Sequence, residues 1–202
     1  MKHAYGSVLA LMLMLHLSLC GWKASIPLLV SISQPFGMKM VSMTGMCILT
    51  IAICFISRAQ GTNLSFWPKQ HHLTAAAVIV SSLLMLSSTA FCFTQGVHGL
   101  LLLLYASVVT PLFEELLFRD HIYAIQQHLH RHTLQIVVMN ALLFAVWHLG
   151  YIMHPLWCGE WMALSKLIVG FLYGLLLAYI RSRTQSTVCC ILTHGAMNSF
   201  FG

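Results

Sequence analysis

The sequence predicts an all-α protein, a polytopic bundle of membrane-spanning helices. Of its 202 residues, 59% are hydrophobic and only 7% are charged, whereas a soluble domain carries roughly 25% charged residues. Largely uncharged stretches that are long enough for a helix to cross a bilayer recur along the whole chain. We therefore expect a single integral membrane domain over residues 1–202, without a sizeable soluble module.

Seven apolar segments are the expected membrane helices. The first follows Lys2 and resembles a signal peptide, but we interpret it as a retained helix. The loop between the second and third segments carries Gly61, Asn63 and Pro68, which favour turns. The last segment is shorter than the roughly 20 residues needed to span, so we expect it to tilt or to enter partway. The segments lie at about 4–22, 38–57, 73–93, 97–118, 134–153, 162–180 and 187–201.

The positive charges predict the orientation of the chain. The ten Lys and Arg residues stand singly at the ends of apolar segments, which is typical of topology signals and not of a nucleic-acid interface, despite a net charge of +6. Because positive residues favour the cytoplasmic side, the N-terminus is expected there, and the compact form fits a bacterial inner membrane. The residues on the N-terminal side are Lys2, Arg58, Lys69, Arg119, Arg131, Arg181 and Arg183.

Sequence motifs of several hydrolase classes are absent. The chain has no H-E-x-x-H and no G-x-S, and Asp120 is its only Asp. These absences argue against a zincin, a serine nucleophile and a pair of catalytic aspartates. The seven Cys include no C-x-x-C pair, so neither a structural zinc module nor a disulfide framework is expected.

The most informative motif is E-E-L-L-F-R at residues 114–119, which ends an uncharged stretch over 97–113. Residues four apart share a helix face, so Glu115 and Arg119 are predicted to form an ion pair. Glu114 points about 100° away and is expected to face a cavity, where it can act as a general base. The alternative is that both Glu residues end a span at the headgroups. Ionisable groups at membrane depth favour the functional interpretation.

Three further polar residues fall in apolar segments. His148 follows Phe144 by four residues in the fifth segment, and His194 and Asn198 share one helix face in the last. Each His alone can be a satisfied interior residue. Together with Glu114, these groups are least costly when they cluster around one water-containing cavity.

Such a cluster supports hydrolysis in two ways. Glu114 can take a proton from water while one His orients that water or protonates the leaving amine, and Asn198 with the other His stabilises an oxyanion. Alternatively, Glu114, His148 and His194 match a catalytic zinc site with an open position. The spacing does not separate these two alternatives.

The order E-E-x-x-x-R, F-x-x-x-H and H-x-x-x-N resembles the CPBP family of intramembrane proteases, which includes CAAX prenyl endopeptidases and bacteriocin-immunity relatives. The resemblance covers about residues 97–200, while residues 1–95 match only as additional transmembrane helices. It implies a CAAX-protease-like helical core and a glutamate-type endopeptidase, for which no cofactor is assigned and zinc stays open. One departure is Asp120, where the family often has Gly.

The resemblance also implies roles for individual residues. Glu114 would be the water-activating base, and His148, His194 and Asn198 would shape the water and oxyanion site. The supporting residues would be Glu115, Arg119 and Phe144.

The expected substrate is a membrane-anchored peptide or protein in the lipid bilayer. Two other functions stay open: a non-catalytic binding or immunity protein for a membrane-active peptide, and a small proton-coupled carrier. The complete polar set favours the protease over a pure binder, and the chain shows no inverted repeat that would support a carrier.

The depth of the site requires one more hypothesis. Glu114 falls near the cytoplasmic end of segment 97–118, whereas His148 falls towards the opposite end of segment 134–153. Both depths agree if the helix that carries Glu114 continues through His128. We expect residues 120–132 to form an amphipathic interfacial helix, in preference to a His-rich metal site.

Overall fold

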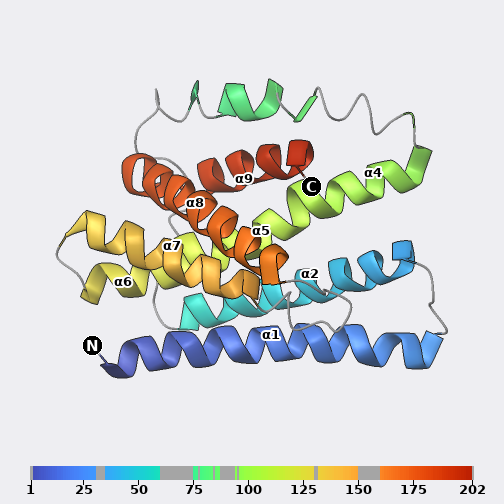
Figure 1. Cartoon of the computed structure of the whole chain (residues 1–202), viewed down its shortest axis with the longest axis horizontal. Helices are drawn as coiled ribbons and strands as arrows, with labels where there is room; N and C mark the ends of the chain where they lie inside the picture. The colour runs from blue at the N-terminus through green and yellow to red at the C-terminus, as the bar shows by residue number, and fades with distance from the viewer. Residues whose placement is uncertain are drawn as a thin grey trace.

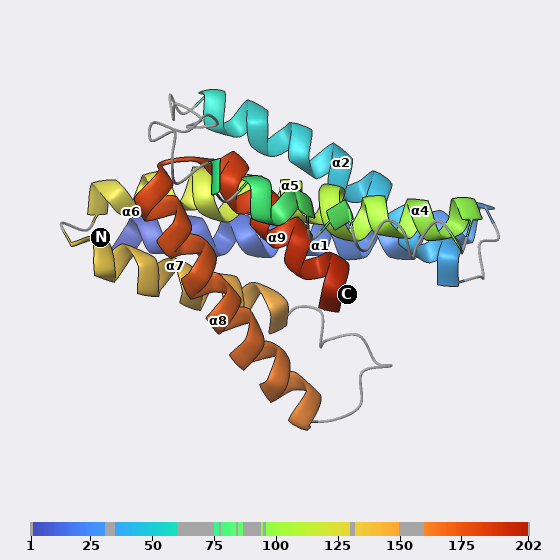
Figure 2. The ribbon, with the colours of Figure 1, turned by 90° about the horizontal axis from the view of Figure 1, so that it is seen from above.

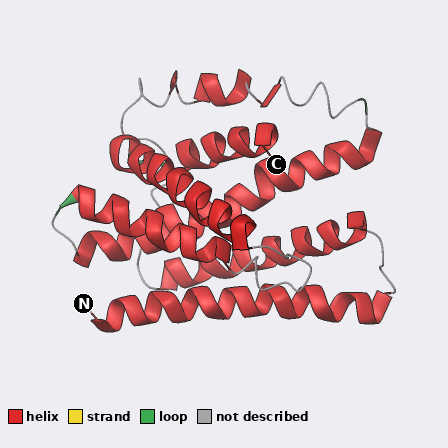
Figure 3. Cartoon of the chain, in the orientation of Figure 1, coloured by secondary structure: helices red, strands yellow, loops and turns green. Residues whose placement is uncertain are grey.

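The computed structural model describes residues 2–30, 35–59, 75–76, 78–83, 85–86, 94, 96–129, 132–149 and 160–201. Within these residues the regular structure is helical, without a strand (Figure 3). This confirms the predicted all-α class. Within the third predicted segment, 73–93, the structure describes residues 75–76, 78–83 and 85–86, and these are helical.

The helices follow the predicted apolar segments closely. Four of the described helical stretches are long and apolar enough to cross a membrane: Tyr5–Ser25, Phe36–Ala59, Gly96–Leu129 and Leu164–Thr184. The apolar stretch Thr133–His148 is shorter. Outside the central run, the helices are α1 Lys2–Val30, α2 Pro35–Ala59, α7 Thr133–Leu149, α8 Glu160–Thr184 and α9 Thr187–Phe201.

The central run, Gly96–Leu129, is one helical stretch of 34 residues. It therefore continues past residue 118 and through His128, as the depth argument required, and Glu114 lies near its middle. Two π-helical turns, which widen the helix locally, interrupt the α-helical geometry. The run consists of α4 Gly96–Leu104, η1 Tyr105–Val109, α5 Thr110–Glu115, η2 Leu116–Ile122 and α6 Tyr123–Leu129.

The first part of segment 120–132 does not lie exposed on the surface of the bundle, contrary to what we expected of an amphipathic interfacial helix. Asp120, His121, Tyr123 and Gln126 are all buried inside the bundle. The reason is tertiary, because α7, α8 and α9 cover this part of the central run with polar partners. Among the described residues of the segment, Gln127, His128 and His132 are exposed.

The helix α1 runs along one edge of the bundle (Figure 1) and packs on it through one apolar stripe. Val8, Met12, Leu15 and Leu19 repeat at helical spacing and are buried in the same hydrophobic core as Phe113 of α5. Leucines on other faces of α1 are exposed, which suits a helix whose outer faces contact lipid.

Small residues let the C-terminal helices approach closely. A Cβ placed on Gly174 of α8 would lie 2.8 Å from the Cα of Ala141 in α7. A Cβ on Gly195 of α9 would collide with the backbone carbonyl oxygen of Ser107 in η1. Figure 2 shows α8 crossing the direction of the central run, with α9 beside that run. The bundle thus brings α7, α8 and α9 against the helix that carries the Glu pair.

Candidate active site

The Glu pair ends α5 and lies in the interior of the bundle. Glu114 is 1% exposed and Glu115 is 0% exposed. Both carboxylates therefore lie inside the protein, near the middle of the central run, and the alternative that they merely end a span at the headgroups does not fit.

Glu115 makes the ion pair that its spacing predicts. Its Oε2 lies 3.2 Å from Nε of Arg119, which is also fully buried. Arg119 donates from Nη2 to the carbonyl oxygen of Gly174 at 3.4 Å, and its guanidinium lies 4.3 Å from the centre of the Phe144 ring. This pair thus connects the central run to α7 and α8.

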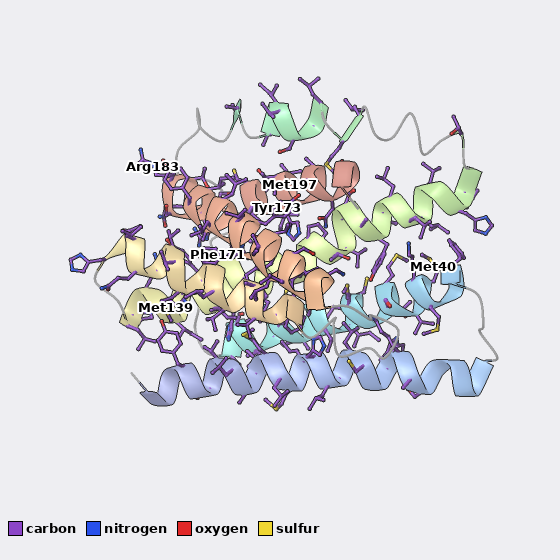
Figure 4. The ribbon with its side chains drawn as sticks, in the orientation of Figure 1. Met40, Met139, Phe171, Tyr173, Arg183 and Met197 are labelled. Carbon is purple, nitrogen blue, oxygen red and sulfur yellow. The ribbon has the colours of Figure 1, made fainter. Side chains whose placement is uncertain are left out.

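His194 of α9 lies between the two carboxylates. Its Nδ1 donates to Oε1 of Glu115 at 2.8 Å, and its Nε2 lies 3.8 Å from Oε2 of Glu114. The contact with Glu115 is a short, charge-assisted hydrogen bond. The distance to Glu114 is too long for a direct hydrogen bond, and such a gap is one that a bridging water can fill. Figure 4 labels Met197 on the same helix and Tyr173 on the adjacent α8.

Glu114 also has a partner on α7. The indole Nε1–H of Trp147 donates to Oε1 of Glu114 at 3.2 Å, and both side chains are buried. The two Glu residues therefore differ: Arg119 forms an ion pair with Glu115, while Trp147 and His194 face Glu114.

His148 borders this cluster through Phe144. Its Nδ1 lies 2.8 Å from the carbonyl oxygen of Phe144. Because a carbonyl only accepts, Nδ1 carries the hydrogen, and Nε2 is the acceptor of the neutral ring. The Phe144 ring lies 4.6 Å from the His148 ring and 5.8 Å from the His194 ring. Phe144 therefore packs against both imidazoles.

Asn198 lies one turn beyond His194 on α9. Its Nδ2 donates to the carbonyl oxygen of Ala106 in η1 at 2.9 Å. The structure thus brings Glu114, Glu115, Arg119, Phe144 and His194 into one cluster, and places His148 and Asn198 at its borders.

The comparison with protein families identifies the same part of the chain. The model of the type II CAAX prenyl endopeptidase Rce1-like family matches residues 96–200, just over half of the 202 residues. The chain belongs to this family. The match confirms the resemblance seen in the sequence motifs, and with the four helices long enough to span it identifies an integral membrane protein. The family is one of intramembrane endopeptidases. No curated protein and no solved structure matches the chain significantly.

Trp147 is the residue that sequence reasoning missed at this Rce1-like site. It stands directly before His148, and its role depends on where α7 crosses α5. The available signal was that a buried Trp usually finds an acceptor for its N–H.

A second polar cluster surrounds η2. Arg181 of α8 donates from Nε to the carbonyl oxygen of Arg119 at 2.7 Å, and its Nη2 lies 3.8 Å from Oδ1 of Asp120. Thr187 of α9 donates to the same carboxylate oxygen at 3.4 Å. Asn140 of α7 donates to the carbonyl oxygen of Phe118 at 2.8 Å. Side chains from three helices therefore satisfy groups of the π-helical turn directly after the Glu pair.

The zinc alternative finds no matching arrangement in the described part of the chain. No group of three or more His, Cys, Asp and Glu residues is placed there to hold a metal ion.

Proposed function

We propose that this protein is an intramembrane endopeptidase of the glutamate type, in which Glu114 activates the water that cleaves a membrane-associated peptide or protein. One observation carries the proposal: His194 lies between two buried carboxylates, 2.8 Å from Glu115 and 3.8 Å from Glu114, and Glu115 also forms the ion pair with Arg119. Glu115 is thereby occupied in holding the ring. Glu114 is the carboxylate suited to proton transfer.

The proposed reaction begins with proton transfer from water to Glu114. The water oxygen attacks the carbonyl carbon of the scissile bond, and the carbonyl oxygen becomes an oxyanion. Hydrogen bonds from Asn198 and from the Nε2–H of His194 in its imidazolium form stabilise that oxyanion. The oxyanion then re-forms the carbonyl as the C–N bond breaks, and Glu114 gives the proton to the leaving nitrogen. In the first step, His148 orients the attacking water by accepting a hydrogen bond from it at Nε2.

The remaining residues support this chemistry by position. The hydrogen bond from Nδ1 to Glu115 directs Nε2 of His194 towards Glu114. Arg119 holds Glu115, and Phe144 packs against Arg119 and both imidazoles. We propose no metal in this mechanism, because proton transfer and hydrogen bonding account for each step.

Proteolysis in proteoliposomes tests the proposal, with a panel of membrane-anchored peptides that includes prenylated C-terminal sequences. We expect Glu114→Gln to lower cleavage by at least about 10²-fold, the usual scale for loss of a general base. Glu160→Gln is the matched control, since Glu160 is the chain's third glutamate and begins α8. A folded Glu114→Gln variant that cleaves at the wild-type rate would exclude the mechanism and favour the binding or immunity function.

We also propose about seven membrane segments, a cytoplasmic N-terminus and a bacterial inner membrane. The uneven distribution of Lys and Arg between the two sides supports this orientation. Single cysteines introduced at the chain termini of a cysteine-free variant, labelled from either side of intact cells, test it. Labelling of the N-terminal position by an impermeant reagent from outside would reverse the assignment.

A further inference from the structure

We propose that Trp147 is a positioning residue for Glu114, and that α1, which lies outside the family-matched segment, holds Trp147 in place through His16. The proposal rests on the proposed role of Glu114 as the base. It assigns a role to a residue that stands at an unspecified position of the F-x-x-x-H motif.

The hydrogen bond from Trp147 fixes the position of one oxygen of the Glu114 carboxylate. The indole N–H is a donor only, and it reaches Oε1 at 3.2 Å. Oε2 faces Nε2 of His194 at 3.8 Å. The two oxygens are thus distinguished by their surroundings: Trp147 occupies Oε1, and Oε2 is directed towards the imidazole. Such bonds to a carboxylate are stronger in a low dielectric than in water.

Three aromatic side chains pack against the indole ring itself. Its centre lies 5.8 Å from the ring of Phe113 and 6.0 Å from the ring of Phe118. His16 of α1 meets it edge-on, with the centroids 5.1 Å apart and the planes at 86°. These distances are typical of favourable aromatic packing, and this packing restricts rotation of the Trp147 indole. The N–H is therefore presented to Glu114 by a clamped ring.

His16 ties this arrangement to α1. It extends the buried stripe formed by Met12, Leu15 and Leu19, because it follows Met12 by four residues and precedes Leu19 by three. The family match covers only residues 96–200. A helix outside the matched segment thus contacts the residue that holds the proposed base.

A residue that aligns a base is expected to affect kcat and to leave KM unchanged. We expect Trp147→Phe, which keeps an aromatic ring but removes the N–H, to lower kcat by about tenfold or more, the scale of a hydrogen bond to a charged group. KM should stay within about twofold, since the substrate's own contacts are retained. The probe is the membrane-anchored peptide that the wild type cleaves fastest.

Trp22→Phe provides the matched control. Trp22 also donates its indole N–H across a helix interface, to the carbonyl oxygen of Val41 at 2.8 Å. Its loss should leave kcat unchanged. His16→Leu should lower kcat in the same direction as Trp147→Phe, and the double variant should be no worse than Trp147→Phe alone, because both act through one contact.

A measurement without substrate tests the hydrogen bond directly. With ¹⁵N-labelled tryptophan, the indole N–H resonance of Trp147 should move upfield in Glu114→Gln, which replaces a charged acceptor with a neutral one. The resonance of Trp22 should not move. An unchanged Trp147 resonance would refute the hydrogen bond, whether or not a cleavable peptide has been found.

The outcomes separate the two proposals. Wild-type cleavage by Glu114→Gln defeats the proposed function, whereas an inactive Glu114→Gln with an unchanged kcat in Trp147→Phe defeats only the role of Trp147. If Trp147→Phe does not fold, β-(3-benzothienyl)alanine incorporated at position 147 tests the role of the N–H instead. This analogue keeps the shape of indole and replaces the N–H with sulfur. Wild-type kcat in that variant would overturn the inference.

Discussion

Replacement of Arg119 by Met tests the buried ion pair that holds the site together. The guanidinium is fully buried, and its Nε lies 3.2 Å from Oε2 of Glu115. It also donates to the carbonyl oxygen of Gly174 and lies over the Phe144 ring. Met fills part of the same volume without charge, so the substitution removes one partner and leaves the Glu115 carboxylate buried.

The expected loss follows from the distance and the environment. At 3.2 Å and an effective dielectric constant of about 20, Coulomb attraction between two unit charges is about 5 kcal/mol. Desolvation of both groups offsets much of this in the intact pair. Removal of one partner leaves the other uncompensated, and such substitutions typically cost about 3–5 kcal/mol. We expect Arg119→Met to lower the free energy of unfolding by that amount.

A double-mutant cycle distinguishes this mechanism from a general packing defect. Glu115→Gln alone leaves the guanidinium buried, whereas Glu115→Gln with Arg119→Met removes both charges. We expect the double variant to be more stable than the sum of the single losses predicts, by about 2 kcal/mol. Reversible unfolding by SDS in mixed micelles measures each free energy. Additivity within about 0.5 kcal/mol, as expected for a control cycle of Arg119→Met with Glu160→Gln, would refute the pairing argument.

Three further predictions follow from other contacts. Gly195→Ala should cost about 1–3 kcal/mol of unfolding free energy in the same SDS assay, because its Cβ would collide with the Ser107 carbonyl, while Gly21→Ala, with open space around its Cβ, should not destabilise. Arg181→Met should destabilise by about 3 kcal/mol or more, because it leaves Asp120 buried without its guanidinium partner, and Asp120→Asn in the same chain should restore part of that loss. Peptide cleavage should be insensitive to chelators, since the described residues present no metal-ligand group; loss of cleavage with EDTA and recovery with zinc would contradict this.

The local part of the site was predictable from the sequence. The Glu115–Arg119 pair depends only on a four-residue spacing within one helix, and the shared face of His194 and Asn198 depends on the same periodicity. The apolar segments also predicted most helix positions, since hydropathy reports directly on membrane burial. These features need no knowledge of how the helices pack.

Contacts between helices could not be predicted from the periodicity of the sequence. Trp147 meets Glu114 across 33 positions, and Arg181 reaches the carbonyl of Arg119 across 62. Neither separation carries a local signal. The two π-helical turns also have no simple pattern in the sequence, and they change which backbone carbonyls need a side-chain donor. The wrong interfacial assignment of Asp120 has this origin, because its buried partners come from α8 and α9.

The helices outside the family-matched segment are part of the same structural unit as the site. A single hydrophobic core contains Val8 of α1, Met46 of α2, Phe113 of α5 and Trp147 of α7. Ser57 of α2 also makes a buried hydrogen bond of 3.0 Å with His121 of η2. Because η2 begins directly after Glu115, these contacts limit how the Glu pair can move relative to α7 and α9. The first two helices therefore act as a support for the site, in addition to anchoring the chain in the bilayer.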